Sequence, residues 1–279
     1  CEFFMECTFK PFIGKTVRAI KVHAKMSKGF HEKILDFAVS LGMGGLGYLE
    51  VDDDLSYRGP IDKFIPDQKK MELIHLAELQ AQDTIFFIAD QEERAAYYAG
   101  QIRNELGKRL DLYEKNAYRF CYVNDFPMYE PDPDTKQIGF THNPFSMPQG
   151  GLSALEEKDP LDILAYQYDI VCNGVELSSG AVRNHDMEIM VKAFGIAGYD
   201  EDTLKQKFGA LYQAFQFGAP PHAGMAPGVD RMIMLLRNEE NIREVTAFPM
   251  SGSAQDLMCD APGEVTERQL REVHIKVRS

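Results

Sequence analysis

The sequence is 279 residues long, with 44% hydrophobic and 26% charged residues, which is typical of one large globular domain or two smaller ones. No apolar run reaches the length of about eighteen residues that a membrane span needs. The formal net charge of −13 at pH 7 argues against a chain that holds nucleic acid by bulk electrostatics, so such a contact requires a local basic surface or another part of the protein.

Residues 1–98 predict a small α/β domain. Apolar runs predict strands, and apolar residues that recur every three or four positions predict helices. Alternating elements of these lengths favour a small sheet with helices packed on one of its faces. The expected strands are 17–23, 46–51 and 84–89, and the expected helices are 31–41 and 69–79.

A glycine-rich stretch from Gly42 to Gly47 matches the pattern G-x-G-x-x-G. In a dinucleotide-binding fingerprint this pattern follows a strand and opens a helix, so that the helix N-terminus faces the pyrophosphate. Here the order is reversed, because the glycines follow a helix and open the strand 46–51. We therefore interpret them as a helix cap and a tight turn.

Beyond residue 98 the sequence predicts a second domain. A charged helical pattern runs from 91 to 110, and the basic residues from Arg103 to Arg119 are interpreted as a solvated helix face. Residues 126–138 and 143–159 are rich in turn-forming residues and predict loops or a hairpin tip. Further strands are expected at 117–124, 169–172 and 175–177, and further helices at 186–194, 202–215, 232–236 and 269–274.

The five cysteines are scattered and include no C-x-x-C pair. Disulfide frameworks of small secreted proteins and zinc ribbons show regular, paired spacings instead. We therefore expect reduced thiols in a cytoplasmic protein. The residues are Cys1, Cys7, Cys121, Cys172 and Cys259.

The segment 217–236, FGAPPHAGMAPGVDRMIMLL, is the most informative one in the chain. Prolines and glycines precede a short helix, and Arg231 falls in or near its first turn, where the helix dipole disfavours a cation. An arginine there needs an anionic partner, the helix N-terminus also favours an anion, and Gly228 would let a ligand approach the backbone. A phosphate group meets these demands. The alternative is a salt bridge from Arg231 to Asp230 or to a loop carboxylate.

A predicted hairpin brings two carboxylates together. Asn173 and Gly174 lie between two apolar runs, which is a strong signal for a two-residue turn. With this turn Val171 pairs with Glu176, and Asp169 points to the same face at a diagonal spacing of roughly 7–8 Å. Two carboxylates at that spacing suit a divalent cation, and two solvated acids on an exposed hairpin are the alternative.

Arg183 and His142 are further candidates. Arg183 follows Glu176 by seven positions and would face away from it in an unbroken strand, unless a bulge in Ser178-Ser179-Gly180 rotates it back. Its planar fork could then pair with the carboxylates or hold a substrate carboxylate. No histidine lies at metal-ligand spacing from His142, so zinc is not expected, and a structural role is the alternative.

Together these segments resemble the class II aminoacyl-tRNA synthetases, and among them the bacterial-type aspartyl-tRNA synthetases. Residues 218–231 resemble motif 3, residues 168–183 resemble the active-site strands before it, and residues 142–145 resemble the flexible loop that contacts aspartate. The resemblance covers essentially the whole chain. It implies an α+β fold with a small α/β GAD insertion domain (1–98) and the C-terminal half of the antiparallel-sheet catalytic domain (99–279).

The resemblance implies an aspartate–tRNA ligase, which activates L-aspartate with ATP and Mg²⁺ and transfers it from aspartyl-adenylate to tRNA. Arg231 and Glu176 would act in catalysis, and Glu176 with Asp169 would hold the metal. Arg183 and His142 would bind aspartate, and a buried bidentate arginine favours aspartate because neutral asparagine would leave the fork unpaired. The implied ATP-binding residues are Glu176, Gly228, Val229, Asp230 and Arg231.

The family also implies parts that this sequence lacks: motif 1, motif 2 with its own arginine, and an anticodon-binding barrel. We therefore expect the chain, which starts at Cys1, to be a C-terminal fragment that is inactive alone. For the full-length protein the resemblance implies a homodimer and tRNA contacts made mainly by the absent regions. Ser178, Ser179 and Asn143 stand where relatives often carry glycine or histidine, which indicates a subgroup difference.

Several alternatives remain. The full-length enzyme could be non-discriminating and charge both the aspartate and the asparagine tRNA. A GAD-containing tRNA-binding module without catalysis would not carry motif 3, and asparaginyl or lysyl relatives lack the insertion. A catalytically inactive paralogue is disfavoured by the presence of Glu176, Arg183 and Arg231.

Overall fold

The computed structural model describes residues 2–4 and 8–278, which divide into two compact units, Cys1–Asn116 and Ala117–Ser279. The predicted boundary at residue 98 falls inside helix α3 (Glu92–Arg109), whose apolar side chains Ile102 and Leu106 are buried in the core of the first unit. The division after Asn116 therefore keeps this helix whole.

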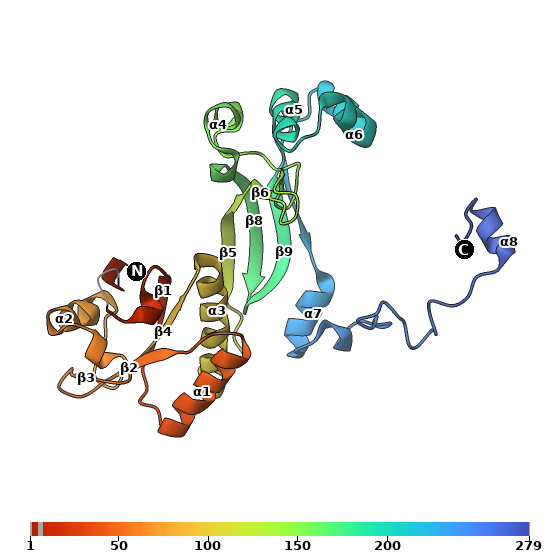
Figure 1. The fold of residues 1–279 in the computed structure, drawn as a ribbon. Helices are drawn as coiled ribbons and strands as arrows, with labels where there is room; N and C mark the ends of the chain where they lie inside the picture. Colours follow the sequence, from red (N-terminus) through yellow and green to blue (C-terminus); the bar gives the residue numbers. More distant parts are fainter. Residues whose placement is uncertain (1, 5–7, 279) are drawn as a thin grey trace. The chain divides into compact units, whose positions relative to one another are not determined.

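The first unit is built on a four-stranded antiparallel sheet (Figure 1). Its strands, in spatial order, are β1 (Thr16–Val22), β4 (Thr84–Asp90), β2 (Gly47–Val51) and β3 (Tyr57–Arg58). Besides α3 it contains α1 (Lys28–Ser40) and α2 (Asp67–Leu76), with short 3-10 helices at Glu2–Phe4, Lys10–Phe12 and Asp62–Phe64.

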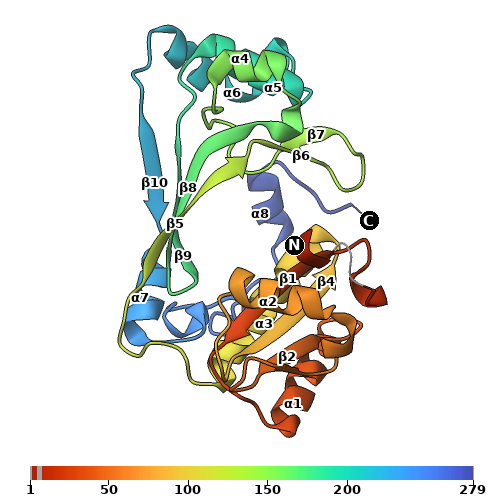
Figure 2. The same ribbon diagram turned by 90° about the vertical axis from the view of Figure 1, so that its left-hand side faces the viewer.

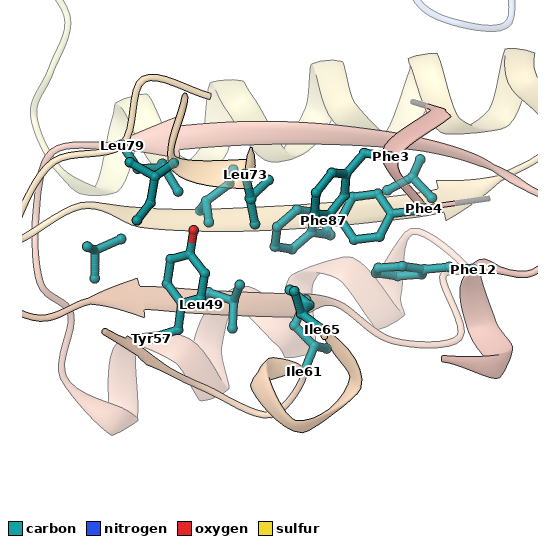
Figure 3. Close-up of a cluster of buried hydrophobic side chains, with 14 residues drawn as sticks. Phe3, Phe4, Phe12, Leu49, Tyr57, Ile61, Ile65, Leu73, Leu79 and Phe87 are labelled. Carbon is teal, nitrogen blue, oxygen red and sulfur yellow. The ribbon is translucent and has the colours of Figure 1, made fainter. Parts of the chain in front are cut away.

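Both faces of this sheet are covered, which corrects the expectation of helices on one face. Along β4, Ile85 and Phe87 join the cluster around α2 and the N-terminal aromatic residues, shown in Figure 3. Phe86 and Ile88 join a second cluster with residues of α1 and α3. Alternate residues of a strand face opposite sides, so the unbroken apolar run of β4 requires burial on both.

The glycine-rich stretch forms the expected turn. Helix α1 ends at Ser40 with Leu41 as its C-cap, and Gly42 follows with a positive φ of 96°. Strand β2 then begins at Gly47. A residue in the left-handed region just past a helix is most easily a glycine, so capping explains the first glycine of the pattern.

The second unit contains a four-stranded antiparallel sheet and a two-stranded hairpin. In spatial order the sheet consists of β10 (Ala223–Pro227), β9 (Val175–Val182), β8 (Leu164–Cys172) and β5 (Phe120–Pro127), and the hairpin of β6 (Tyr129–Pro131) and β7 (Ile138–Phe140). The helices are α4 (Gly151–Glu157), α5 (Met187–Ile196), α6 (Glu201–Gln216), α7 (Val229–Arg237) and α8 (Glu267–Glu272), with 3-10 helices at Pro160–Asp162 and Ile242–Glu244.

Helices α4, α5 and α6 lie at one end of the long strands β5, β8 and β9 (Figures 1 and 2), and α7 packs against β9 near the other end. Neither α4 nor β10 was predicted from the sequence. Strand β10 has the sequence AGMAP, and it is an edge strand that pairs with β9 alone. An edge position tolerates proline, which an inner strand does not.

No helix of the described residues is both long and apolar enough to cross a membrane. Cys121, Cys172 and Cys259 are free thiols, as expected. Cys1 and Cys7 lie outside the described residues.

Candidate active site

The guanidinium of Arg231 lies against Glu176. Its Nη1 donates a hydrogen bond to the backbone oxygen of Glu176 at 2.7 Å and lies 3.2 Å from the carboxylate Oε1. The two side chains are 44% and 46% exposed, so a ligand in solution can reach both. The anionic partner of Arg231 is thus a strand carboxylate, rather than Asp230 or a loop carboxylate.

Arg231 reaches this position from the first turn of α7. Gly228 caps the helix without a side-chain hydrogen bond, and its own N–H donates to Leu177 O at 2.7 Å, which ties the helix start to β9. A Cβ built on Gly228 would lie 3.6 Å from Leu177 O and from Cδ of Arg231, an ordinary contact. Packing within the chain therefore does not require glycine here. Close approach of a ligand to the backbone of residue 228 would require it. Val229 beside it is 64% exposed.

The hairpin before Glu176 forms as predicted. Asn173 and Gly174 both have positive φ, and Val171 pairs with Glu176. The register then shifts, because the next pair is Ile170 with Ser178. Leu177 is therefore an extra residue in β9, which makes this point a β-bulge.

The bulge decides which face Arg183 occupies. Beyond it, Asp169 pairs with Ser179, and the next pair on that face is Gln167 with Ala181. Directly opposed residues share a face, and Arg183 continues the alternation two positions after Ala181. Arg183 therefore shares its face with Asp169 and with Glu176. The bulge lies at Leu177, one position before the stretch Ser178-Ser179-Gly180 in which the sequence allows one.

Tyr168 links strands β8, β9 and β10 on the opposite face of the sheet. Its hydroxyl donates to Gly224 O at 3.2 Å, so the side chain reaches from β8 across β9 to β10. A Cβ on Gly180 would come within 2.6 Å of both Gly224 O and the Tyr168 ring. Gly180 is thus required for the strands to pack this closely.

The loop that carries His142 is attached next to Arg183. Ser146 forms a β-bridge with Arg183, and the N–H of Asn184 donates to Phe145 O at 2.8 Å. His142 itself is exposed, with its ring edge-on to that of Phe126 at a centroid distance of 5.3 Å. The backbone thus brings this loop to the strand end that carries Arg183.

The charged side chains of the site are not all paired with one another. In the part of the chain that the structure describes, no carboxylate forms an ion pair with Arg183. Over the same residues no group of three or more histidine, cysteine, aspartate or glutamate side chains is placed to hold a metal ion. A cation on Asp169 and Glu176 would therefore take its other ligands from a bound molecule or from water, as Mg²⁺ commonly does with phosphates.

The first unit has a cavity of about 850 Å³ beside the turn that follows α1. Its walls are largely aromatic and aliphatic, and Gly44, Gly45 and Gly47 contribute to them. None of the candidate residues for chemistry lies in this cavity. Arg231 and Glu176, the candidate residues for phosphate binding, lie in the second unit.

Comparison with known families shows which family the sequence matches. The sequence model of the class II tRNA synthetases (D, K and N) matches residues 6–252. The chain belongs to this family. An aspartate–tRNA ligase of Streptomyces avermitilis is 52% identical over 99% of this chain and 48% of its own length. An aspartate–tRNA(Asp/Asn) ligase of Ehrlichia chaffeensis is 49% identical over 99% of this chain and 48% of its own length.

The resemblance to the bacterial aspartyl enzymes, which the motifs predicted, is thereby confirmed. The mixed fold, with its antiparallel sheets and helices, agrees with the expected α+β class. The chain spans about half the length of the curated relatives that it matches.

Proposed function

We propose that this chain supplies the motif 3 side of the active site of an aspartate–tRNA ligase. The contact between Arg231 and Glu176 carries the proposal, because it joins the start of a helix to a strand carboxylate on one accessible surface. The names of the relatives at about 50% identity support the same activity.

In the proposed reaction an oxygen of the aspartate α-carboxylate attacks the α-phosphorus of ATP. The new O–P bond forms as the bond to pyrophosphate breaks, which gives aspartyl-adenylate, and tRNA then displaces AMP. Little proton transfer is needed in the first step, so the protein contributes mainly position and charge. Arg231 stabilises negative charge on the phosphates, and Gly228, Val229 and Asp230 form the floor beneath the nucleotide.

The residues of β8 and β9 fit a divalent cation at the phosphates. Asp169 and Glu176 share a face, and two carboxylates together with phosphate oxygens form a suitable ligand set for Mg²⁺. When bound, Mg²⁺ would supply positive charge that favours the leaving pyrophosphate. Glu176 would therefore serve both the cation and Arg231.

Arg183 and His142 would hold the amino acid. The planar guanidinium of Arg183 suits bidentate binding of the aspartate side-chain carboxylate. The neutral amide of asparagine would leave this fork without a charged partner, which disfavours asparagine. His142 would close over the substrate from the attached loop.

Aspartate-dependent exchange of pyrophosphate into ATP by the full-length protein tests the proposed function. We expect exchange with L-aspartate and Mg²⁺, and none by residues 1–279 alone, since the family's motif 2 arginine is not in this sequence. Failure of the full-length protein to exchange with any amount of aspartate would reject the proposal. We further propose that this protein is a cytoplasmic homodimer. We also propose that the first unit, which extends the predicted residues 1–98 through helix α3, is a GAD insertion domain.

A second candidate is a non-discriminating enzyme that charges both the aspartate and the asparagine tRNA. The Ehrlichia chaffeensis relative, named for both tRNAs, favours it. Charging assays with the two purified tRNAs separate the candidates, because only a non-discriminating enzyme attaches aspartate to the asparagine tRNA.

A further inference from the structure

Gln167 connects β8 to the loop that carries His142. Its side chain is buried, with 7% of the residue exposed, and its Nε2 donates to the backbone oxygen of Asn143 at 3.3 Å. Gln167 lies two residues before Asp169 on the same face, opposite Ala181. A buried amide thus joins the face of the candidate site to the loop beside it.

The loop is a tight turn at the point where Gln167 holds it. The side-chain Oδ1 of Asn143 accepts from the N–H of Phe145 at 2.9 Å, and its backbone oxygen accepts from the N–H of Ser146 at 3.2 Å. The turn is therefore internally braced and is positioned as a unit. Backbone bonds from Met147 to Val182 in β9 and from Asn184, just beyond β9, to Phe145 fix its far end. Gln167 fixes the end next to His142.

We propose that Gln167 is a positioning residue for the amino-acid substrate, which it does not touch. By holding Asn143 against the strand face, it sets the distance between His142 and the substrate carboxylate bound at Arg183. This inference rests on the proposed aspartate activation. Sequence reasoning missed Gln167 because nothing in its spacing shows that its partner would be a backbone oxygen 24 positions away.

The chain offers a matched control. Gln149 also donates through Nε2 to a neighbouring side chain and to β8, namely to Asp125 Oδ1 at 2.8 Å and Ala165 O at 3.4 Å. Gln149 has no part in the proposed site. Methionine has nearly the volume of glutamine and lacks the donor, so Gln167→Met and Gln149→Met each remove an amide donor that bonds to a neighbouring segment.

The experiment measures KM for aspartate and for ATP in pyrophosphate exchange by the full-length protein, together with the thermal midpoint. Gln167→Met is expected to raise KM for aspartate about fivefold, the worth of one hydrogen bond, with KM for ATP unchanged. Gln167→Ala is expected to do the same or more. Gln149→Met is expected to leave both constants unchanged.

A merely structural role predicts another pattern. The thermal midpoint would fall while KM for aspartate stayed constant, or the KM values for aspartate and ATP would rise together, and either result overturns the proposal. An equal rise in KM for aspartate in Gln149→Met overturns it as well. If the wild type is active and the Gln167 variants have its KM for aspartate, the positioning role alone is rejected. If the wild type is inactive, the proposed function is rejected and this inference with it.

Discussion

Arg231 is bound to Glu176 through the backbone as well as through the side chain. The 2.7 Å hydrogen bond to the backbone oxygen would persist if the Glu176 carboxylate turned toward a cation. The guanidinium has five donors, so this bond leaves others for a ligand. The contact thus holds Arg231 at the strand while the 3.2 Å ion pair remains exchangeable.

Replacement of this arginine tests its role. We expect Arg231→Lys in the full-length protein to lower kcat of pyrophosphate exchange by about a hundredfold, because lysine cannot keep the backbone bond and offer a planar fork together. Stability should change by less than about 1 kcal/mol, since the ion pair is half exposed. Arg237→Lys, in the last turn of the same helix, is the control and should retain full activity. Equal activity in the two variants would contradict the assigned role.

Arg183 should determine the choice of amino acid. We expect Arg183→Met to lower kcat/KM for aspartate by roughly 10- to 100-fold, because hydrogen bonds to charged groups contribute about 1.5–3 kcal/mol. The preference for aspartate over asparagine should fall with it. Exchange assays with both amino acids measure this, with Arg237→Met as the control. An unchanged preference would show that another group recognises the side-chain carboxylate.

The close packing of β8, β9 and β10 predicts a contrast between two glycines. Gly180→Ala places a methyl group 2.6 Å from Gly224 O and the Tyr168 ring, so we expect a loss of about 1–3 kcal/mol in the free energy of unfolding. No atom lies within 4 Å of a Cβ built on Gly224, so Gly224→Ala should cost much less. Urea unfolding of both variants measures the two losses in free energy of unfolding. Similar losses would mean that Tyr168 does not lie across the strands.

Glu50 in the first unit predicts a dependence of stability on pH. Burial raises the pKa of this carboxyl, but hydrogen bonds from His31, Arg58 and the N–H of Met26 outweigh burial and hold the pKa below its ordinary value. A depressed pKa in the folded state adds stability above the ordinary value of roughly 4.3, and this stability is lost as pH falls further.

Glu50→Gln should therefore lower the free energy of unfolding by about 1–3 kcal/mol at pH 7, as measured by urea titration. Between about pH 5 and pH 3, the range that spans the ordinary pKa of the carboxyl, the free energy of unfolding should fall less in this variant than in the wild type. Glu93→Gln, at an exposed position of the same unit, is the control. A pH profile of Glu50→Gln that parallels the wild type would rule out this source of acid sensitivity.

Much of the candidate site was predictable because short-range signals fix it. Asn173-Gly174 set the hairpin, and its register placed Val171 opposite Glu176, as the structure has it. The start of α7 near Arg231 was also predictable, from the prolines and glycines that precede it, whereas its partner Glu176 lies 55 positions away and follows from the fold. The hairpin and the helix start depend on neighbours in the sequence.

Other features depend on packing between distant segments. The bulge at Leu177 leaves no mark in composition, yet it moves Arg183 to the face of Asp169. Strand β10 contains proline and glycine and forms only because β9 offers it an edge. Alternate residues of β4 are buried in two separate clusters, and which helices cover each face depends on packing between segments that are distant in the sequence.

A crystal structure of the full-length protein with L-aspartate, Mg²⁺ and a non-hydrolysable ATP analogue tests the central claim most directly. We expect the triphosphate between Arg231 and the carboxylates of Glu176 and Asp169, with the aspartate side chain on Arg183. A nucleotide bound elsewhere, with the ion pair between Arg231 and Glu176 undisturbed, would contradict the account.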